Sequence, residues 1–245
     1  MITSPDNPRV KEVLRLRKGR ERRREGLFVA EGVREVGRAI EAGLTRHALY
    51  LAPELLPDAR YDGAEEVSAR VLAKMAYRDE PEGVLGVFEI PHRTLPDDAT
   101  LILVAVGIEK PGNLGAMART ADAAGADAIL VAEARSDPWN PNAIRASTGA
   151  VFTLPILDAS LDEIAALSQQ KVAATIGAPH EHTDLDYRRP TAFLVGAEDT
   201  GLPQAYREAA DDAVEIPMRG TAADSLNASA AAAVLLFEAV RQRAT

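Results

Sequence analysis

Three short segments of the chain combine glycine or proline turns with polar side chains that could carry out chemistry. The segments cover residues 113–119, 196–201 and 216–227. Their reactive or polar side chains are Asn113, Arg119, Glu198, Ser225 and Asn227. An arginine, a carboxylate, a hydroxyl and two amides can orient a hydroxyl group, help to remove its proton and stabilise the charge that develops on its oxygen.

Each segment alone also has a simpler structural explanation. Asn113 and Ser225 stand where helices are expected to begin, so both side chains could be helix caps. Arg119 could be an ordinary surface arginine. Glu198 lies between two glycines, which fits a plain strand-to-helix turn as well as a loop where a ligand approaches the backbone closely.

Regularly alternating strands and helices position these segments. The strands are expected at residues 101–108, 128–132, 151–157, 172–177, 192–196 and 214–218, and the helices at 114–124, 142–147, 161–169, just after 203, and 226–243. The strands are continuous apolar runs, which is typical of a parallel sheet covered on both faces. Such sheets bind ligands at the carboxyl ends of their strands, where all three segments lie.

The N-terminal part predicts a smaller α/β unit. Strands are expected at residues 26–31, 47–52 and 84–90, and helices at 33–42 and 65–75. Residues 91–98 are polar, contain two prolines and form the best linker candidate. The pattern therefore predicts two domains, at residues 1–93 and 98–245.

Several site types are disfavoured by what the sequence lacks. It contains no Gly-x-Gly and no Gly-Lys-Ser/Thr, which argues against a dinucleotide fingerprint, a glycine-rich methyltransferase loop and a P-loop. It contains no cysteine. His180, His182, Asp184 and Asp186 lie in a polar loop without ligand spacing, so a solvated loop is favoured over a metal site and no metal is expected.

Charge and hydropathy bound the partners. The chain carries a net charge of −9, but residues 1–26 hold nine basic and four acidic side chains, a net of +5. This basic end predicts a phosphate-binding surface or, equally well, a solvated helix face. The start of the chain lacks a signal pattern, and its longest clean apolar run, residues 101–108, is too short for a membrane span. A cytoplasmic protein without a membrane partner is expected.

Together the three segments resemble the SpoU/TrmH family of RNA ribose 2′-O-methyltransferases, in the SPOUT superfamily. The family motifs are matched in order by Asn113, Gly115 and Arg119, by Gly196, Glu198 and Gly201, and by Ile216 to Met218 followed by Ser225 to Asn227. The resemblance implies a C-terminal α/β domain with a parallel sheet and a trefoil knot.

The N-terminal half resembles the substrate-binding domain that many members of this family carry, whose α/β fold is similar to that of ribosomal protein L30e. The matching residues are 3–11, 28–34 and 81–86, and residues 145–149 match a segment whose arginine the family implicates in RNA binding. The RNA-binding side chains that we expect are Arg9, Lys11, Arg22, Arg23 and Arg145.

The resemblance also implies a cofactor, S-adenosylmethionine, held by Gly196, Ile216 and Leu226. The family gives the central role to the arginine of the first motif, here Arg119. Because a guanidinium stays protonated, we expect Arg119 to clamp a phosphate and to stabilise an oxyanion rather than to act as a base. We expect Asn113, Glu198, Ser225 and Asn227 to arrange that site.

The resemblance predicts a homodimer that methylates RNA. Large-subunit ribosomal RNA is favoured over tRNA, and the modified nucleotide is left open. The alternative is a non-catalytic RNA-binding or ribosome-assembly protein of the same fold. A nicotinamide oxidoreductase is disfavoured by the missing Gly-x-Gly.

Overall fold

The computed structural model describes residues 1–222 and 224–244 and divides into two compact units. Unit 1 comprises Met1–His92 and Trp139–Thr153, and unit 2 comprises Arg93–Pro138 and the chain from Leu154 onward. Unit 1 is therefore built from two separate stretches of the chain, and the sequence pattern did not predict the second one. The domains at residues 1–93 and 98–245 remain a prediction.

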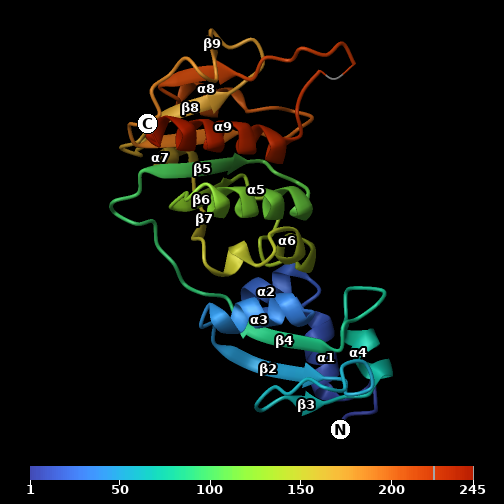
Figure 1. Cartoon of the computed structure of the whole chain (residues 1–245). Coiled ribbons are helices and arrows are strands. Elements are labelled where there is room, and N and C mark those ends of the chain that lie inside the picture. The colour runs from blue at the N-terminus through green and yellow to red at the C-terminus, as the bar shows by residue number, and fades with distance from the viewer. Residues whose placement is uncertain (223, 245) are drawn as a thin grey trace. The chain divides into compact units, whose positions relative to one another are not determined.

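Unit 1 is built on a four-stranded mixed sheet with the strand order β1-β4-β2-β3. Strand β4 runs antiparallel to β1 and β2, whereas β3 is parallel to β2. The strands are β1 (Leu27–Glu31), β2 (Arg46–Leu51), β3 (Glu65–Glu66) and β4 (Val84–Glu89). The helices are α1 (Pro8–Arg15), α2 (Gly19–Glu25), α3 (Val33–Glu41), α4 (Ala69–Met75), α6 (Pro141–Ala146) and the short 3-10 helix η1 (Ala150–Phe152), as Figure 1 shows.

An aromatic cluster packs the second stretch of unit 1, Trp139–Thr153, against the sheet of this unit. The ring of Phe28, on β1, lies 4.8 Å from Trp139 and 5.6 Å from Phe152, measured between ring centroids. Its other neighbour is Phe88 on β4, at 5.9 Å. Phe28, Phe88 and Phe152 are completely buried. Residues 139–153 are therefore part of the hydrophobic core of unit 1.

Unit 2 is built on a seven-stranded, wholly parallel sheet with the order β7-β6-β5-β10-β8-β11-β9. The strands are β5 (Leu101–Val106), β6 (Ala128–Ala132), β7 (Ile156–Asp158), β8 (Gln170–Ala174), β9 (His180–Glu181), β10 (Thr191–Val195) and β11 (Asp212–Glu215). The helices are α5 (Pro111–Ala123), α7 (Leu161–Ala165), α8 (Gln204–Glu208) and α9 (Ala228–Arg243).

Helices cover both faces of this sheet, as the apolar strands predicted. Ile164 of α7 and Tyr206 of α8 pack on one face in a core cluster with Ile102 and Leu194. Helix α9 packs against α5 and β10 (Figure 1). Since β11 lies near the sheet edge and β10 at its centre, the end of the chain returns from the edge to the middle of the sheet.

The strand predicted at residues 151–157 is wrong in its first half. Ala150–Phe152 form the 3-10 helix η1, and only Ile156–Asp158 form a strand. The preceding turn has positive φ angles at Thr148 (52°) and Gly149 (92°). The apolar side chains of η1 are buried in unit 1. The apolar run at residues 151–152 therefore belongs to the core of unit 1 and not to the parallel sheet, where the sequence analysis placed it.

The helix predicted at residues 65–75 begins later than expected. Glu65–Glu66 pair with β2 as the short strand β3. The helix begins at Ala69, because the Ser68 side chain accepts a hydrogen bond from the backbone amide of Val71 and so caps it.

In the polar loop between β8 and β10, Asp184 and Asp186 accept hydrogen bonds from residues of the same loop. Asp184 accepts a hydrogen bond from the backbone amide of Glu181, and hydrogen bonds from Arg188 hold the pKa of Asp186 below its usual value. In residues 1–222 and 224–244, no three His, Asp or Glu side chains converge as a metal site. Among the same residues, no helix combines the length and apolar character that crossing a bilayer requires.

Replacing Phe28 with alanine should destabilise unit 1 strongly. A buried phenylalanine truncated to alanine costs about 3–5 kcal/mol, since apolar contacts are lost and a cavity remains. Trp139 is the single tryptophan and touches this ring, so its fluorescence during urea titration measures the effect. The control is Ile40→Ala, whose side chain is 43% exposed and should change stability by about 0.5 kcal/mol or less. Equal stabilities for the two variants would contradict the core assignment.

Candidate active site

The three polar segments meet at the carboxyl edge of the sheet in unit 2. The first segment follows β5 and the second follows β10, and these two strands are direct neighbours. The third follows β11 and leads into α9. Because all the strands are parallel, the loops that leave them emerge on the same edge. Ala223, within the third segment, lies outside the described residues.

The carboxylate of Glu198 is the centre of a hydrogen-bonded cluster. It accepts hydrogen bonds from the side-chain amide of Asn113, at 2.8 Å, and from that of Asn227. Lys110 Nζ lies 3.3 Å from its other oxygen. The amide nitrogen of Asn227 also lies 3.3 Å from Asn113 Oδ1. One carboxylate therefore joins all three segments, and it is half-buried.

The structure excludes the alternative in which Asn113 and Ser225 are helix caps. Helix α5 begins at Pro111, and Asn113 donates to Glu198 instead of capping it. The cap of α9 is Asn227, whose side-chain oxygen accepts a hydrogen bond of 2.9 Å from the amide of Ser229. Ser225 lies before this cap and is exposed. The two ends of the Asn227 amide thus have separate roles, one in the helix and one in the cluster.

Arg119 does not join this cluster within one chain. It follows Asn113 by six residues on α5, which places it roughly 9 Å further along the helix axis and about 120° around it. Its side chain is exposed, and it has no hydrogen bond or ion pair within the described residues. Ser225 likewise has no hydrogen-bond partner in that part of the chain. The structure brings together Asn113, Glu198 and Asn227, but not Arg119 or Ser225.

A cleft of about 810 Å³ lies beside Glu198. It is lined by the three expected cofactor residues, Gly196, Ile216 and Leu226. Met218 of the third segment also lines it, and further lining residues that sequence reasoning missed include Ile176, Glu181 and Arg207. The cleft volume falls within the range of about 300–1,000 Å³ that is usual for small-molecule sites. The lining combines apolar side chains with five acidic ones and two arginines, so it suits a small ligand that has both apolar and charged parts.

Gly196 allows the wall of this cleft to form. A Cβ atom built there would lie 2.3 Å from the backbone carbonyl carbon and oxygen of Gly201. Ala197 and Gly201 form an antiparallel bridge, so the loop after β10 folds back on itself. Gly201 has a φ of +66°, which favours glycine there. Both glycines of the second segment are therefore required by the backbone.

A smaller cavity of about 160 Å³ adjoins the cleft and is lined by Lys110, Asn113, Glu198 and Ala228. Glu198 and Ala228 line both hollows, so the carboxylate stands between them. Lys110 was missed by sequence reasoning. Its position in the sequence could have revealed it, because it directly precedes the proline that begins α5 and lies one helical turn before Asn113.

A wholly parallel sheet, a last helix that returns to its centre and a cleft walled by three loops define the SPOUT class of α/β methyltransferases. The chain belongs to the SpoU rRNA methylase family, whose sequence profile matches residues 100–237. An MRM3-like substrate-binding domain matches residues 7–86.

Relatives and solved structures cover nearly the whole chain. A protein of Streptomyces viridochromogenes, named 23S rRNA (uridine(2479)-2′-O)-methyltransferase, is 34% identical over 91% of this chain and 85% of its own length. The crystal structure of an RNA 2′-O ribose methyltransferase has 44% identity and a TM-score of 0.85, covering 100% of this chain and 99% of that one. The SpoU methyltransferase AviRb from Streptomyces viridochromogenes, solved with AdoMet, has 31% identity and a TM-score of 0.85, covering 98% and 99%.

These matches confirm the predicted family and fold class, a parallel-sheet SPOUT methyltransferase domain with a substrate-binding domain before it. The chain is an enzyme, an RNA 2′-O-methyltransferase that uses S-adenosylmethionine.

Replacing Gly196 with alanine should weaken cofactor binding by at least about tenfold. The new methyl group would overlap the Gly201 backbone, which cannot move aside as a flexible side chain would, so the cleft wall must shift. Isothermal titration calorimetry with S-adenosylmethionine measures the change. The control is Gly37→Ala, where the added atom meets nothing within 4 Å. Unchanged affinity in the Gly196 variant would show that this backbone contact does not shape the cofactor site.

Proposed function

We propose that the methyl acceptor is a ribose of large-subunit ribosomal RNA, as the name of the Streptomyces relative states for that protein. The observation that supports this is the matching substrate-binding domain together with the shared family of the catalytic domain. Such a substrate implies a cytoplasmic enzyme. The test is incubation with labelled S-adenosylmethionine and separated RNA species, followed by mapping of the linkage that resists alkali. Label in tRNA alone would refute the proposed substrate.

The proposed mechanism uses the cluster as a rigid frame for the reacting ribose. Bound S-adenosylmethionine supplies an electrophilic methyl group. Asn113 and Asn227 fix the Glu198 carboxylate, so its orientation costs no reorganisation during the reaction. The frame orients the 2′-hydroxyl, which gives up its proton to water as its oxygen bonds to the methyl carbon. The bond from that carbon to the sulfonium sulfur breaks at the same time, and the neutral thioether leaves with the bonding electrons.

Arg119 is proposed to bind the phosphate next to the reacting ribose and to stabilise the negative charge on its oxygen. Its exposure and its lack of a partner among the described residues leave its guanidinium free for RNA. Ser225, also exposed, is proposed to contact the substrate at the mouth of the cleft, which it lines. The alternative of a non-catalytic binding protein is set aside, because the chain belongs to an enzyme family.

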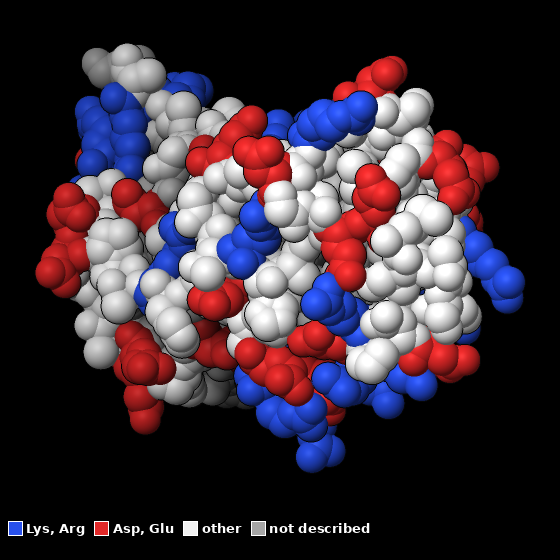
Figure 2. Space-filling model, turned by 90° about the horizontal axis from the view of Figure 1, so that it is seen from below, with Lys and Arg blue, Asp and Glu red and all other residues white. Residues whose placement is uncertain are grey.

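The basic N-terminal segment is proposed to supply RNA affinity through Arg9, Lys11 and Arg23, which are exposed. The expected RNA contact of Arg22 is wrong. Its side chain is 2% exposed and donates to the backbone carbonyls of Leu16 and Arg17, so it holds the turn between α1 and α2 and is not available to RNA. On the face that Figure 2 shows, basic and acidic side chains are interspersed.

A homodimer is proposed through the exposed face of α9. Phe237 on this helix is 48% exposed. Val234 lies one turn and Ala230 two turns before it on the same face, and neither is buried. An apolar helix stripe with a large exposed aromatic ring is typical of a surface that another protein covers. A second copy is the occupant that this proposal names, and it would add a second α9 to the site region.

Replacing Arg119 with lysine should lower kcat by roughly 100-fold, because lysine keeps the charge but loses the planar pair of donors. RNA and S-adenosylmethionine affinities should change little. Single-turnover methylation assays and filter binding measure the two effects. The matched control is Arg189→Lys, an exposed arginine of unit 2 away from the cleft. Near-normal turnover in the Arg119 variant would refute the proposed role.

Replacing Phe237 with glutamate should produce a monomer at micromolar concentration, since a charge would be desolvated in the interface. Multi-angle light scattering measures the mass in solution. The Arg189→Lys protein serves again as the control that keeps the wild-type mass. A wild-type protein that is already monomeric would refute the dimer.

A further inference from the structure

The smaller cavity beside Glu198 contains charged side chains that the cluster around this carboxylate does not use. It is lined by Ile108, Glu109, Lys110, Asn113, Ala197, Glu198, Asp199 and Ala228. Its volume is about 160 Å³, and an engineered cavity of about 150 Å³ in another protein holds one benzene molecule. The smaller cavity therefore accommodates roughly one six-membered ring.

Lys110 keeps hydrogen-bond donors for a ligand of this cavity. Its ammonium group has a single acceptor within the described residues, the Glu198 carboxylate at 3.3 Å, and carries further N–H groups. The side chain is 74% exposed, so the ion pair with Glu198 holds it only weakly. Lys110 lines the smaller cavity and not the cofactor cleft. Its free donors therefore serve a group that enters the smaller cavity.

Asp199 is the carboxylate of the cavity that keeps unused acceptor capacity. One of its oxygens accepts a hydrogen bond of 2.9 Å from the backbone amide of Thr200, and the other accepts none from the part of the chain that the structure describes. The remaining carboxylates are engaged, since Glu198 is bound by two amides and Glu109 pairs with Arg135 at 2.7 Å. Asp199 thus offers acceptors where Lys110 offers donors.

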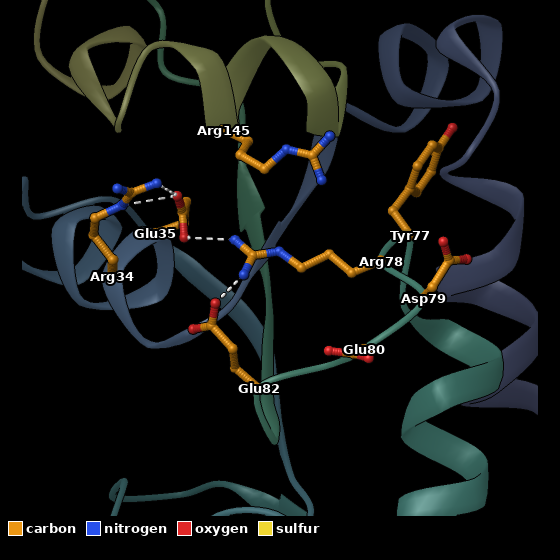
Figure 3. Close-up of a pocket in the computed structure, with 8 residues that line it drawn as sticks. All are labelled: Arg34, Glu35, Tyr77, Arg78, Asp79, Glu80, Glu82 and Arg145. Carbon is orange, nitrogen blue, oxygen red and sulfur yellow. Dashed lines mark hydrogen bonds and ion pairs between the residues drawn. The ribbon is translucent and has the colours of Figure 1, made fainter.

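Asp199 differs in this respect from Glu35 and Glu82, which line a larger hollow in unit 1 (Figure 3). Both of those carboxylates pair there with Arg78. Glu35 also pairs with Arg34 at 2.6 Å. Their charges are compensated within the protein, whereas Asp199 has no ion pair among the described residues. Its charge remains available to a ligand.

A carboxylate beside an ammonium group matches the hydrogen-bonding edge of guanine. Guanine carries its N1–H and 2-amino donors side by side, with the O6 acceptor next to them. Both donors can bind one carboxylate in a bidentate manner, and O6 then faces the ammonium group. Uracil has one donor between two acceptors, and adenine and cytosine have one amino group beside an acceptor nitrogen. Each of these three bases would bring a lone pair against the carboxylate, which disfavours its binding.

The charges of the smaller cavity favour a neutral base over an ion. Three carboxylates, those of Glu109, Glu198 and Asp199, line it together with one lysine. A phosphate group would be repelled by the carboxylates, and the ammonium group of the cofactor would be repelled by Lys110. A neutral base with adjacent donors and one acceptor avoids both repulsions.

We propose that the smaller cavity binds the base of the nucleotide that is methylated and selects guanine. Asp199 accepts hydrogen bonds from N1–H and the 2-amino group, and Lys110 donates to O6. Glu198 lines both the cavity and the cofactor cleft, so a base in the cavity leaves its ribose beside this carboxylate. This assignment rests on the proposed function, methylation of a ribose at this site, and adds the identity of the base.

The methylated nucleoside gives the first test. The full-length protein is incubated with S-adenosylmethionine and with separated ribosomal RNA and tRNA, and the RNA is digested to nucleosides for mass spectrometry. The expected product is 2′-O-methylguanosine. Methylated uridine, adenosine or cytidine as the main product would overturn the assignment. Methylguanosine in tRNA alone would refute the proposed RNA substrate and not the proposed base.

Inosine at the mapped position tests the role of Asp199, because inosine lacks the 2-amino group of guanosine. With RNA assembled by ligation, the wild type should lose about 5- to 150-fold in kcat/KM on inosine, the range for one base contact. Asp199→Ala should be slower on guanosine and should no longer distinguish the two nucleosides. The control is Asp122→Ala, an exposed carboxylate on α5 outside both hollows, which should keep the wild-type preference.

Lys110 is tested by a pair of variants. Lys110→Met should lower kcat/KM on guanosine and inosine alike, since both bases carry O6, and Lys110→Arg should restore most of the loss because it keeps a donor. Isothermal titration calorimetry should give the wild-type affinity for S-adenosylmethionine in every variant. That affinity also verifies that unit 2 is folded.

Two results with the variants would overturn the assignment. The first is that Asp199→Ala still prefers guanosine over inosine as strongly as Asp122→Ala does. The second is that Asp199→Ala or Lys110→Met binds S-adenosylmethionine at least about tenfold more weakly, which would make the cavity part of the cofactor site.

Discussion

The catalytic unit depends on one carboxylate that is bound by amides from distant parts of the chain. Glu198 follows the central strand β10, Asn113 lies in the first turn of α5, and Asn227 begins α9. A carboxylate only accepts hydrogen bonds, so two amides and an ammonium group can satisfy it without competing. Because Asn227 also caps α9, the start of that helix and the position of the carboxylate are fixed together.

Close backbone packing supplies the rest of the frame. The loop after β10 can close over the cleft because Gly196 has no side chain. On α9, Ala228 and Ala232 are buried where this helix packs against α5 and β10, and small side chains allow helices to approach closely.

The sequence predicted more of the fold than of the contacts. Strand β6 covers residues 128–132, as its apolar run predicted. The glycines of the second motif, Gly196 and Gly201, stand where the backbone requires glycine. The order of strands in the sheet is a long-range property, so the convergence of Ile176 and Arg207 on one cleft could not be derived from local sequence patterns. Arg22 looked like a surface cation because composition does not show which arginine caps a buried turn. Residues 151–152 were misassigned because an apolar run does not say which core will bury it.

The return of residues 139–153 to unit 1 limits how the two units can be exchanged during evolution. The chain passes between the units at residues 92–93, 138–139 and 153–154. A domain joined by a single linker can be exchanged by one recombination event. If residues 1–92 were exchanged in this way, the part of the core of unit 1 that lies in residues 139–153 would stay behind. The SpoU rRNA methylase match at residues 100–237 includes this segment, so residues 139–153 are inherited with the catalytic unit although their side chains complete the core of unit 1.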